Sequence, residues 1–290
     1  MRGWSSHPEP ARTRLMYERS ACFSAIIALA IVVAGLGCTR PSSAVADSRR
    51  SIDVAVSASA SRAVRDLGRL YRDRTGHEVR VSVGSTGALF AQIQRGAPFD
   101  VWVAADTVRP ARLAADGTLA PVGWGRWGTG RLVLFAPTQL DVANPAELGV
   151  WDDTGQRLLH VLRALSASGA LVARANPRTA PYGAAATQVL EQLGFEGFAG
   201  PTAESVGQAY QMVRSAAAEA AFVARAQMLD EPDHHFIVVP TTLHPGLPHG
   251  LVLLQRGYDK PHAVEFHEFL LSAEAADIWR RHGFDPVQTP

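Results

Sequence analysis

Short apolar runs typical of β-strands alternate along the chain with segments whose apolar residues recur at helical spacing. The stretch 59–74, for example, places Val64, Leu67 and Tyr71 on one helical face. Strands separated by helices of this size are typical of a parallel, doubly wound sheet, so we predict an α/β fold. The predicted strands are 52–56, 79–83, 101–105, 132–135, 171–175, 221–224, 236–239 and 251–254, and the predicted helices are 59–74, 88–95, 182–193, 205–217, 262–271 and 273–282.

The length of 290 residues favours two domains over one, because domains average about 150 residues. We predict two lobes, each a mostly parallel sheet flanked by helices. Lobe 1 is expected to combine residues 51–133 with 250–290, and lobe 2 to hold residues 134–249. The two chain crossings, near 133–137 and 249–254, are the expected hinges.

The first 38 residues have the pattern of an export signal. Four arginines precede an apolar run over 21–37, which ends at Cys38. A run of this length is at the lower limit of a membrane span, but Gly35 and Gly37 before the cysteine favour cleavage. The segment resembles a bacterial lipoprotein signal, in which the cysteine is lipidated, although Gly35 stands where that signal usually has leucine. We therefore predict a signal peptide over 1–38, lipidation at Cys38 and a polar tether over 39–50.

The net charge of the chain does not indicate which class of partner the protein binds. The formal net charge of the whole chain is +1, and removal of residues 1–38 leaves −1. There is no broad basic field of the kind that binds nucleic acid. If the mature protein captures an anion, local dipoles must hold it.

Hydroxyl residues follow the first two predicted strands, at the points where helices begin. Ser59 follows the first strand, and Ser85 and Thr86 follow the second within the sequence Gly-Ser-Thr-Gly. The carboxyl ends of parallel strands are where open α/β sheets bind their ligands. A helix N-terminus adds unpaired N–H groups and a positive dipole end. Each serine or threonine alone is an ordinary helix cap, but the paired occurrence favours an anion site.

Two further helix starts lie in the second half of the chain. Tyr182 stands in the opening Pro-Tyr-Gly, and Val206 follows Glu-Ser in the next opening. Backbone N–H groups at these starts offer donors and no acceptors. Such a site suits an anion that is fully ionised at neutral pH.

These segments together resemble the molybdate-binding periplasmic proteins of ABC transporters (the ModA family). The most specific part is the Gly-Ala-Pro-Phe-Asp element over 96–100, followed by a short strand and Ala-Asp at 105–106. The resemblance covers most of residues 51–285 and implies a type II, two-lobed periplasmic-binding-protein fold. The segments that carry it are 54–64, 84–100, 101–106, 132–137, 176–190, 203–210 and 275–284.

The resemblance also implies roles for single residues. Ser59 resembles the first hydroxyl ligand and Thr86, with Ser85, the second, while Tyr182 and Val206 match positions that donate backbone N–H groups. One departure is Ala224, which stands where some members place a ligand tyrosine.

The function implied by this resemblance is extracytoplasmic capture of molybdate or tungstate for an ABC importer. The expected partners are the permease and its ATPase, with no cofactor, no catalysis and no nucleic acid. We expect a monomer in the periplasm or on the outer face of the cytoplasmic membrane.

Three other functions are alternatives to the capture of molybdate or tungstate. Another oxyanion, such as sulfate, would suit the same kind of site. A metal site is suggested by ten histidines, but their spacings repeat no ligand motif. A hydrolase would need a nucleophile, yet no serine lies in a G-x-S-x-G elbow.

Overall fold

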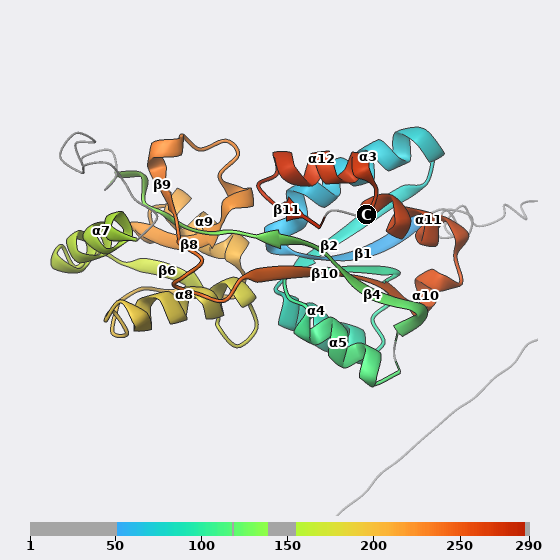
Figure 1. Ribbon diagram of the computed structural model, residues 1–290, viewed down its shortest axis with the longest axis horizontal. Coiled ribbons are helices and arrows are strands. Elements are labelled where there is room, and N and C mark those ends of the chain that lie inside the picture. Colours follow the sequence, from blue (N-terminus) through green and yellow to red (C-terminus); the bar gives the residue numbers. More distant parts are fainter. Residues whose placement is uncertain (1–50, 118, 139–154, 288–290) are drawn as a thin grey trace, which may run out of the picture. The chain divides into compact units, whose positions relative to one another are not determined.

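The computed structural model describes residues 51–117, 119–138 and 155–287, which form two β-sheets flanked by helices (Figure 1). The predicted signal, the tether and Cys38 lie outside these residues. No helix within the described ranges combines the length and the hydropathy that a membrane span needs.

The first sheet has six strands in the order β11-β4-β10-β3-β1-β2. Strand β1 lies between β2 and β3 and is parallel to both, whereas β10, β4 and β11 join as antiparallel neighbours. The strands are β1 (Ser51–Ser57), β2 (Glu78–Gly84), β3 (Val101–Ala104), β4 (Leu119–Gly130), β10 (Leu247–Leu254) and β11 (Asp285–Pro286).

The helices of this part of the chain follow the predicted pattern with three additions. The 3-10 turn η2 (Ala58–Ala60), helix α5 (Val108–Ala115) and the short helix α10 (Gln255–Tyr258) were not predicted. Asp106, just before α5, accepts a hydrogen bond from the backbone N–H of Arg109 at 3.0 Å. The other helices are α3 (Ser61–Thr75), α4 (Thr86–Gln94), α11 (Pro261–Leu270) and α12 (Ala273–Arg281).

The second sheet has five strands in the order β7-β6-β8-β5-β9. Here β6 is parallel to β7 and β8, and β5 is antiparallel to β8 and β9. Its strands are β5 (Leu132–Phe135), β6 (Val172–Ala175), β7 (Thr202–Ala203), β8 (Ala220–Ala224) and β9 (Phe236–Val238), and its helical segments are α7 (Gln156–Ala167), α8 (Pro181–Gln192), α9 (Val206–Arg214), η3 (Arg225–Gln227) and η4 (Asp233–His235).

The predicted α/β class is confirmed, but both sheets are mixed rather than mostly parallel. In the first sheet the reason is the long strand β10, which is antiparallel to β3 and β4, and in the second it is β5, which is antiparallel to β8 and β9. Figure 1 shows β4 and β10 running from one sheet toward the other. The sequence analysis missed β4 because its segment, LAPVGWGRWGTG, is rich in glycine and has no regular alternation.

The chain passes from the first sheet to the second between Gly130 and Leu132, and it returns after Val238. The first point lies beside the predicted crossing at 133–137, whereas the predicted crossing at 249–254 lies within β10. The division into lobes of 51–133 with 250–290, and of 134–249, remains our proposal.

Apolar side chains fill the space between each sheet and its helices. Trp102 and Trp279 are buried in the first part, and Phe135 and Phe222 in the second. One cluster joins the two parts, since Ala58 and Ala105 of the first pack with the core of the second. The turns that follow β1 and β3 therefore face the second sheet.

Candidate functional site

Ser59 is held in a buried polar cluster just beyond the carboxyl end of β1. Its side chain is only 3% exposed. Its Oγ lies 3.3 Å from Ser57 Oγ and 3.2 Å from His249 Nε2. Ser59 therefore has polar neighbours from its own turn and from the distant strand β10.

Thr86 opens α4 beyond the end of β2, with Ser85 as the N-cap residue. Both are buried, and Thr86 Oγ1 accepts a hydrogen bond of 3.1 Å from the N–H of Ala105 at the end of β3. Since that bond uses the oxygen as an acceptor, the hydroxyl hydrogen of Thr86 remains a donor. Ser85 makes no capping hydrogen bond.

The start of α4 lies against the turn that precedes α8. Gly87 N–H donates to the Thr179 carbonyl at 2.7 Å, and Arg109 Nη2 donates to the Arg178 carbonyl at 3.0 Å. A Cβ at position 87 would lie 2.9 Å from Thr179 Cα, so this approach requires glycine. The start of α4, with Ser85 and Thr86, therefore contacts the turn that leads into α8, the helix of Tyr182.

Tyr182, the second residue of α8, points its hydroxyl toward the Ser59 cluster. A Cβ built on Gly130 would lie 2.0 Å from Tyr182 Oη and 2.7 Å from His249 Cε1. The hydroxyl is buried and forms no hydrogen bond of normal geometry with the described residues. Burial raises the pKa of Tyr182 well above its usual value, an effect that the nearby Ser59 hydroxyl partly offsets. The group therefore stays protonated and remains a donor.

Val206 begins α9 directly against the turn that holds Ser59. The N-cap Ser205 Oγ accepts from Gln208 N–H at 3.3 Å, which leaves the first N–H groups of the helix free. A Cβ on Gly207 would lie 3.4 Å from Ala58 Cβ, so α9 starts beside η2.

Gln227 contacts Ala224, the position at which some members of the family that the sequence resembles have a ligand tyrosine. Its Oε1 accepts from Ala224 N–H at 3.0 Å, and its Nε2 donates to the Val206 carbonyl at 3.2 Å. This amide joins the end of β8 to the start of α9. Ala224 itself is fully buried and brings no hydroxyl.

The structure therefore gathers the starts of η2, α4, α8 and α9 into one region. The N–H groups of Thr86, Tyr182 and Val206 have no partner within their own helices, and none donates to another backbone group in the described ranges. All five residues expected at the site, including Ser59 and Ser85, are buried there. Their role as ligand residues remains a prediction.

His249 and Gly130 are among the residues of this region that sequence reasoning missed. His249 is completely buried, and burial lowers its pKa to about 4, although a hydrogen bond to the Leu247 carbonyl acts in the opposite direction. The available signal was a histidine inside an otherwise apolar strand. Gly130 gave no signal, because its role depends on a side chain 52 positions away.

The metal alternative gains no support from the described part of the chain, where no group of three or more His, Cys, Asp or Glu residues is placed to hold an ion. His244 is buried and its Nδ1 lies 2.5 Å from the Pro245 carbonyl. Burial lowers the pKa of His244, and the carbonyl contact only partly opposes that effect.

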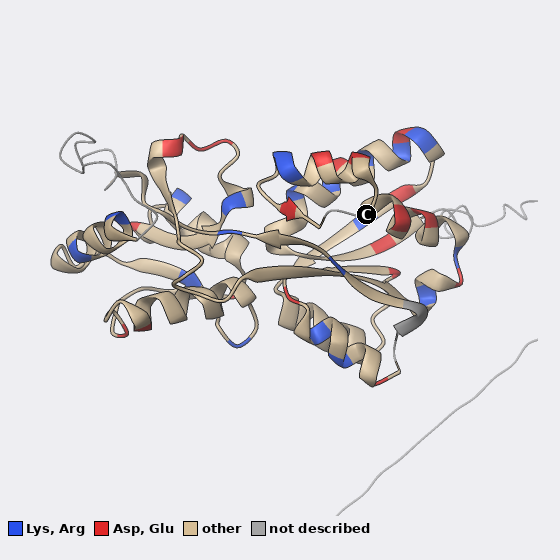
Figure 2. Cartoon of the chain, viewed as in Figure 1, with Lys and Arg blue, Asp and Glu red and all other residues tan. Residues whose placement is uncertain are grey.

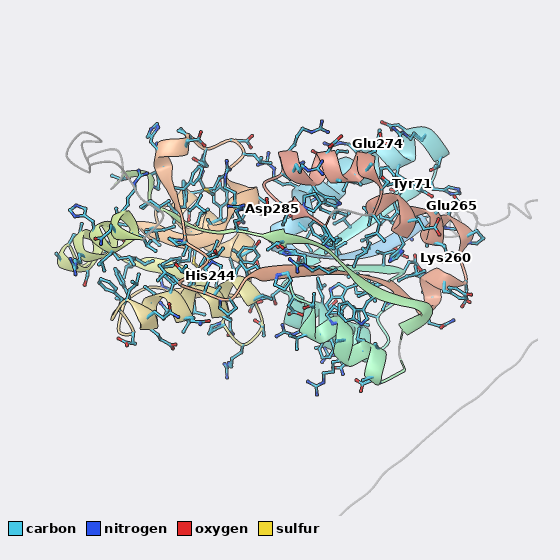
Figure 3. The ribbon with its side chains drawn as sticks, viewed as in Figure 1. Tyr71, His244, Lys260, Glu265, Glu274 and Asp285 are labelled. Carbon is cyan, nitrogen blue, oxygen red and sulfur yellow. The ribbon has the colours of Figure 1, made fainter. Side chains whose placement is uncertain are left out.

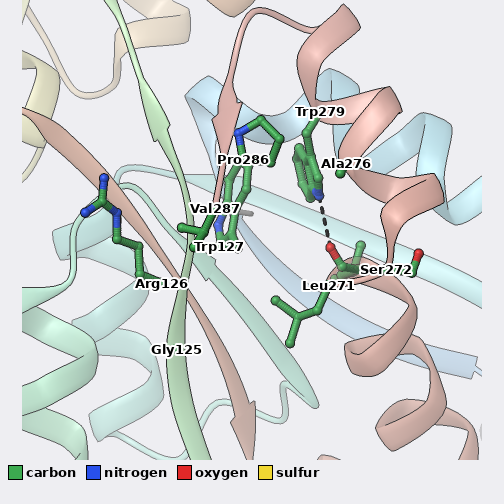
Figure 4. Close-up of a pocket in the computed structure, with 10 residues that line it drawn as sticks. Gly125, Arg126, Trp127, Leu271, Ser272, Ala276, Trp279, Pro286 and Val287 are labelled. Atoms are coloured by element: carbon green, nitrogen blue, oxygen red, sulfur yellow. Dashed lines mark hydrogen bonds between the residues drawn. The ribbon is translucent and has the colours of Figure 1, made fainter. Parts of the chain in front are cut away.

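A separate pocket of about 250 Å³ lies between β4 and the two last helices (Figure 4). Trp127 and Trp279 form its wall, with ring centroids 3.9 Å apart, and Trp279 Nε1 donates to the Leu270 carbonyl at 3.0 Å. Arg126 is the one charged residue in its lining. This lining is mainly apolar, so it lacks the gathered donors of the Ser59 region.

Charge is distributed evenly over the rest of the described chain. Figure 2 shows basic and acidic segments interspersed along α3 and α12, while most of the strands carry neither. Many of these charges form exposed pairs, such as Arg69 with Asp66 and Arg280 with Asp277. The site therefore lies in a protein without a dominant basic face.

Comparison with known proteins gives one consistent picture. The family model for bacterial extracellular solute-binding proteins matches residues 52–285. The molybdate-binding protein ModA of Rhodobacter capsulatus is 33% identical over 233 residues, covering 79% of this chain and 86% of that protein. ModA of Azotobacter vinelandii is also 33% identical, over 240 residues, covering 80% and 89% of the two chains. The solved Azotobacter vinelandii periplasmic molybdate-binding protein aligns with a TM-score of 0.68 at 29% identity, covering 82% of this chain and all of that one.

Proposed function

The chain belongs to the bacterial extracellular solute-binding proteins, and from that premise we propose that it captures molybdate or tungstate for an ABC importer. The protein is a binding protein and not an enzyme. Its task is to bind the anion outside the cytoplasm and to deliver it to a membrane permease powered by an ATPase.

The observation that carries this proposal is the convergence of four helix or turn starts on one buried region, to which each start brings uncharged donors. Ser59, Thr86, Tyr182 and Val206 bring hydroxyl or backbone donors to it. Each free N–H group lies at the positive end of a helix dipole. Several such donors together can hold a doubly negative ion without an arginine or lysine.

Such a site would select by size and by protonation state. Donors without acceptors disfavour an oxyanion that still carries an acidic proton, such as hydrogen phosphate. Sulfate is fully ionised but smaller than molybdate, so in a cavity of fixed size its bonds would be longer and weaker. We therefore expect affinity to fall from molybdate and tungstate to sulfate and then to phosphate.

Calorimetric titration of the mature protein with these four anions tests the proposal directly. Replacing Ser59 and Thr86 together by alanine should weaken molybdate binding by roughly 3–6 kcal/mol, since both hydroxyls would make charge-assisted bonds. Ser168 and Ser215 provide a matched control, because their hydroxyls only bond carbonyls at the ends of α7 and α9. If the Ser59 and Thr86 double variant binds as the control does, the site lies elsewhere.

We further propose that Cys38 anchors the mature protein through a lipid, with 39–50 as the tether, and that the protein works as a monomer. The test is fractionation of cells that express the full chain. Cys38→Ala should move the protein from the membrane to the soluble extracytoplasmic fraction.

A further inference from the structure

The buried ring of His249 joins the hydroxyls of Ser59 and Tyr182, which come from opposite sheets. Ser59 follows β1 of the first sheet, and Tyr182 begins α8 beside the second. His249 Nε2 lies 3.2 Å from Ser59 Oγ. The Tyr182 and His249 ring centroids lie 6.0 Å apart, with the rings at 70°.

The hydrogen-bond geometry fixes the tautomer of this histidine. Nδ1 lies 2.8 Å from the Leu247 carbonyl, which can only accept, so Nδ1 carries the hydrogen. In the neutral ring Nε2 is then an acceptor, and the Ser59 hydroxyl donates to it.

The surroundings of the ring favour this neutral form. Trp127 packs edge-on at 5.3 Å and Phe284 at 5.2 Å between centroids. Tyr182 is the one titratable side chain among the printed ring and hydrogen-bond neighbours of His249 within the described residues, and its hydroxyl stays protonated. No carboxylate among those neighbours stabilises an imidazolium.

A hydroxyl that donates to His249 cannot donate the same hydrogen to an anion. If Ser59 turns its hydrogen to a bound oxyanion, the buried Nε2 loses its donor, and an unpaired buried acceptor is costly. The Tyr182 hydroxyl, buried, unpaired and beside Cε1 of the ring, is the group available to replace it.

We propose that His249 is a positioning residue of the anion site, which takes its hydrogen bond from Ser59 when the site is empty and from Tyr182 when an anion is bound. This inference rests on the proposed function. In this exchange Ser59 can give its hydrogen to the anion only when α8 holds the Tyr182 hydroxyl close to His249. Anion binding therefore favours the approach of the two sheets, and that approach favours anion binding. The exchange also gives the Tyr182 side chain a role distinct from its backbone N–H.

A double-mutant cycle measures this coupling by calorimetry with sodium molybdate. Tyr182→Phe should weaken binding about tenfold in the wild-type background, because Nε2 is then left without a donor in the complex. In a His249→Leu background the same change should alter the dissociation constant less than twofold. His267→Gln is the matched control, since His267 also has its pKa lowered to about 4, by burial in α11, but lies outside the cluster. An equal effect of Tyr182→Phe in both backgrounds, or no effect in either, overturns the proposal.

Nitrogen-15 NMR of histidine-labelled protein tests the inference without relying on affinity. His249 should show a protonated Nδ1 and an unprotonated, hydrogen-bonded Nε2, and Ser59→Ala should shift the Nε2 resonance in the empty protein. A protonated Nε2 overturns the proposal even if molybdate binds. If the wild-type protein binds none of the four anions while the Nε2 result is as expected, the proposed function fails and the Ser59 to His249 bond stands.

Discussion

The two ends of strands β1 and β3 bury different kinds of polar group. At the carboxyl end lie the neutral hydroxyls of Ser57, Ser59 and Thr86. At the other end, near the start of each strand, lie the carboxylates of Asp53 and Asp100. Both ends bury polar groups, but the fully buried carboxylate lies at only one of them, because the Asp106–Arg109 pair just beyond the carboxyl end of β3 remains partly exposed.

At the charged end the described contacts satisfy the carboxylates. Asp100 is fully buried and contacts Arg256 Nη1 at 3.0 Å and Lys260 Nζ at 2.8 Å; Lys260 is labelled in Figure 3. It also accepts from Asp53 N–H at 2.8 Å. Burial acts to raise the pKa of Asp53, but hydrogen bonds from Arg256 and Arg80 hold it below its usual value.

At the neutral end donors remain unpaired within the described chain, among them the Tyr182 hydroxyl and the first N–H groups of α8 and α9. The comparison teaches that ion pairs whose partners are all present stabilise the fold, whereas hydrogen-bond donors without a partner in the protein can bind a ligand. Changes at the first end should alter stability, and changes at the second should alter affinity.

Removal of Asp100 should have the largest effect on stability. Asp100→Ala leaves Lys260 and Arg256 without their buried partner, so we expect a loss of about 3–5 kcal/mol in the free energy of unfolding. Urea denaturation measures it, with Asp277→Ala of an exposed pair as the control. The folded fraction should still bind molybdate with unchanged affinity. A large loss of affinity would contradict the prediction that changes at the charged end alter stability and not binding.

Lowering the pH should lower the free energy of unfolding, because His249 is buried in its neutral form. Unfolded histidine takes up a proton below pH 6.5, whereas burial delays protonation of folded His249 until about pH 4. The free energy of unfolding should therefore be highest above pH 6.5 and should decrease as the pH falls to 4, by about 3 kcal/mol for this residue. Denaturation curves measured across this range check the slope, and His249→Leu should make it shallower. An unchanged slope in the variant would contradict the buried neutral ring.

Gly130→Ala should change affinity more than stability. The new Cβ would lie 2.0 Å from Tyr182 Oη and would force α8 away from the Ser59 cluster. Overpacking costs up to about 1–3 kcal/mol of stability where the neighbours cannot shift; if α8 shifts instead, molybdate binding should weaken by more than stability falls. Gly125→Ala on the same strand is the control, because nothing lies within 4 Å of its added Cβ. Calorimetry with sodium molybdate measures the change, and an affinity equal to that of the control would contradict the close contact at Gly130.

The smallest effect is expected at an exposed ion pair on β11. Arg131 Nε donates to Asp285 at 2.9 Å, and both side chains are more than half exposed (Asp285 is labelled in Figure 3). Asp285→Asn should change the free energy of unfolding by less than about 1 kcal/mol, and less still in high salt. Thermal unfolding at two salt concentrations checks this. A larger loss would mean that surface pairs contribute as much as the buried ones.

The sequence by itself determined where strands give way to helices and which residues begin those helices. Local signals sufficed for Thr86, Tyr182 and Val206, because helix starts depend on spacing, small residues and proline within a few positions. Ser59, predicted to open the first helix, lies instead in the turn η2 that precedes α3. The same signals predicted the α/β class.

Only the tertiary structure decided which of these starts face one another. The antiparallel insertion of β10 between β3 and β4 brings His249 to Ser59, a residue 190 positions earlier. It also makes Gly130 the neighbour of Tyr182. Such pairings depend on strand order and sheet register, which local propensity does not specify because many distant strand pairs satisfy the same apolar pattern.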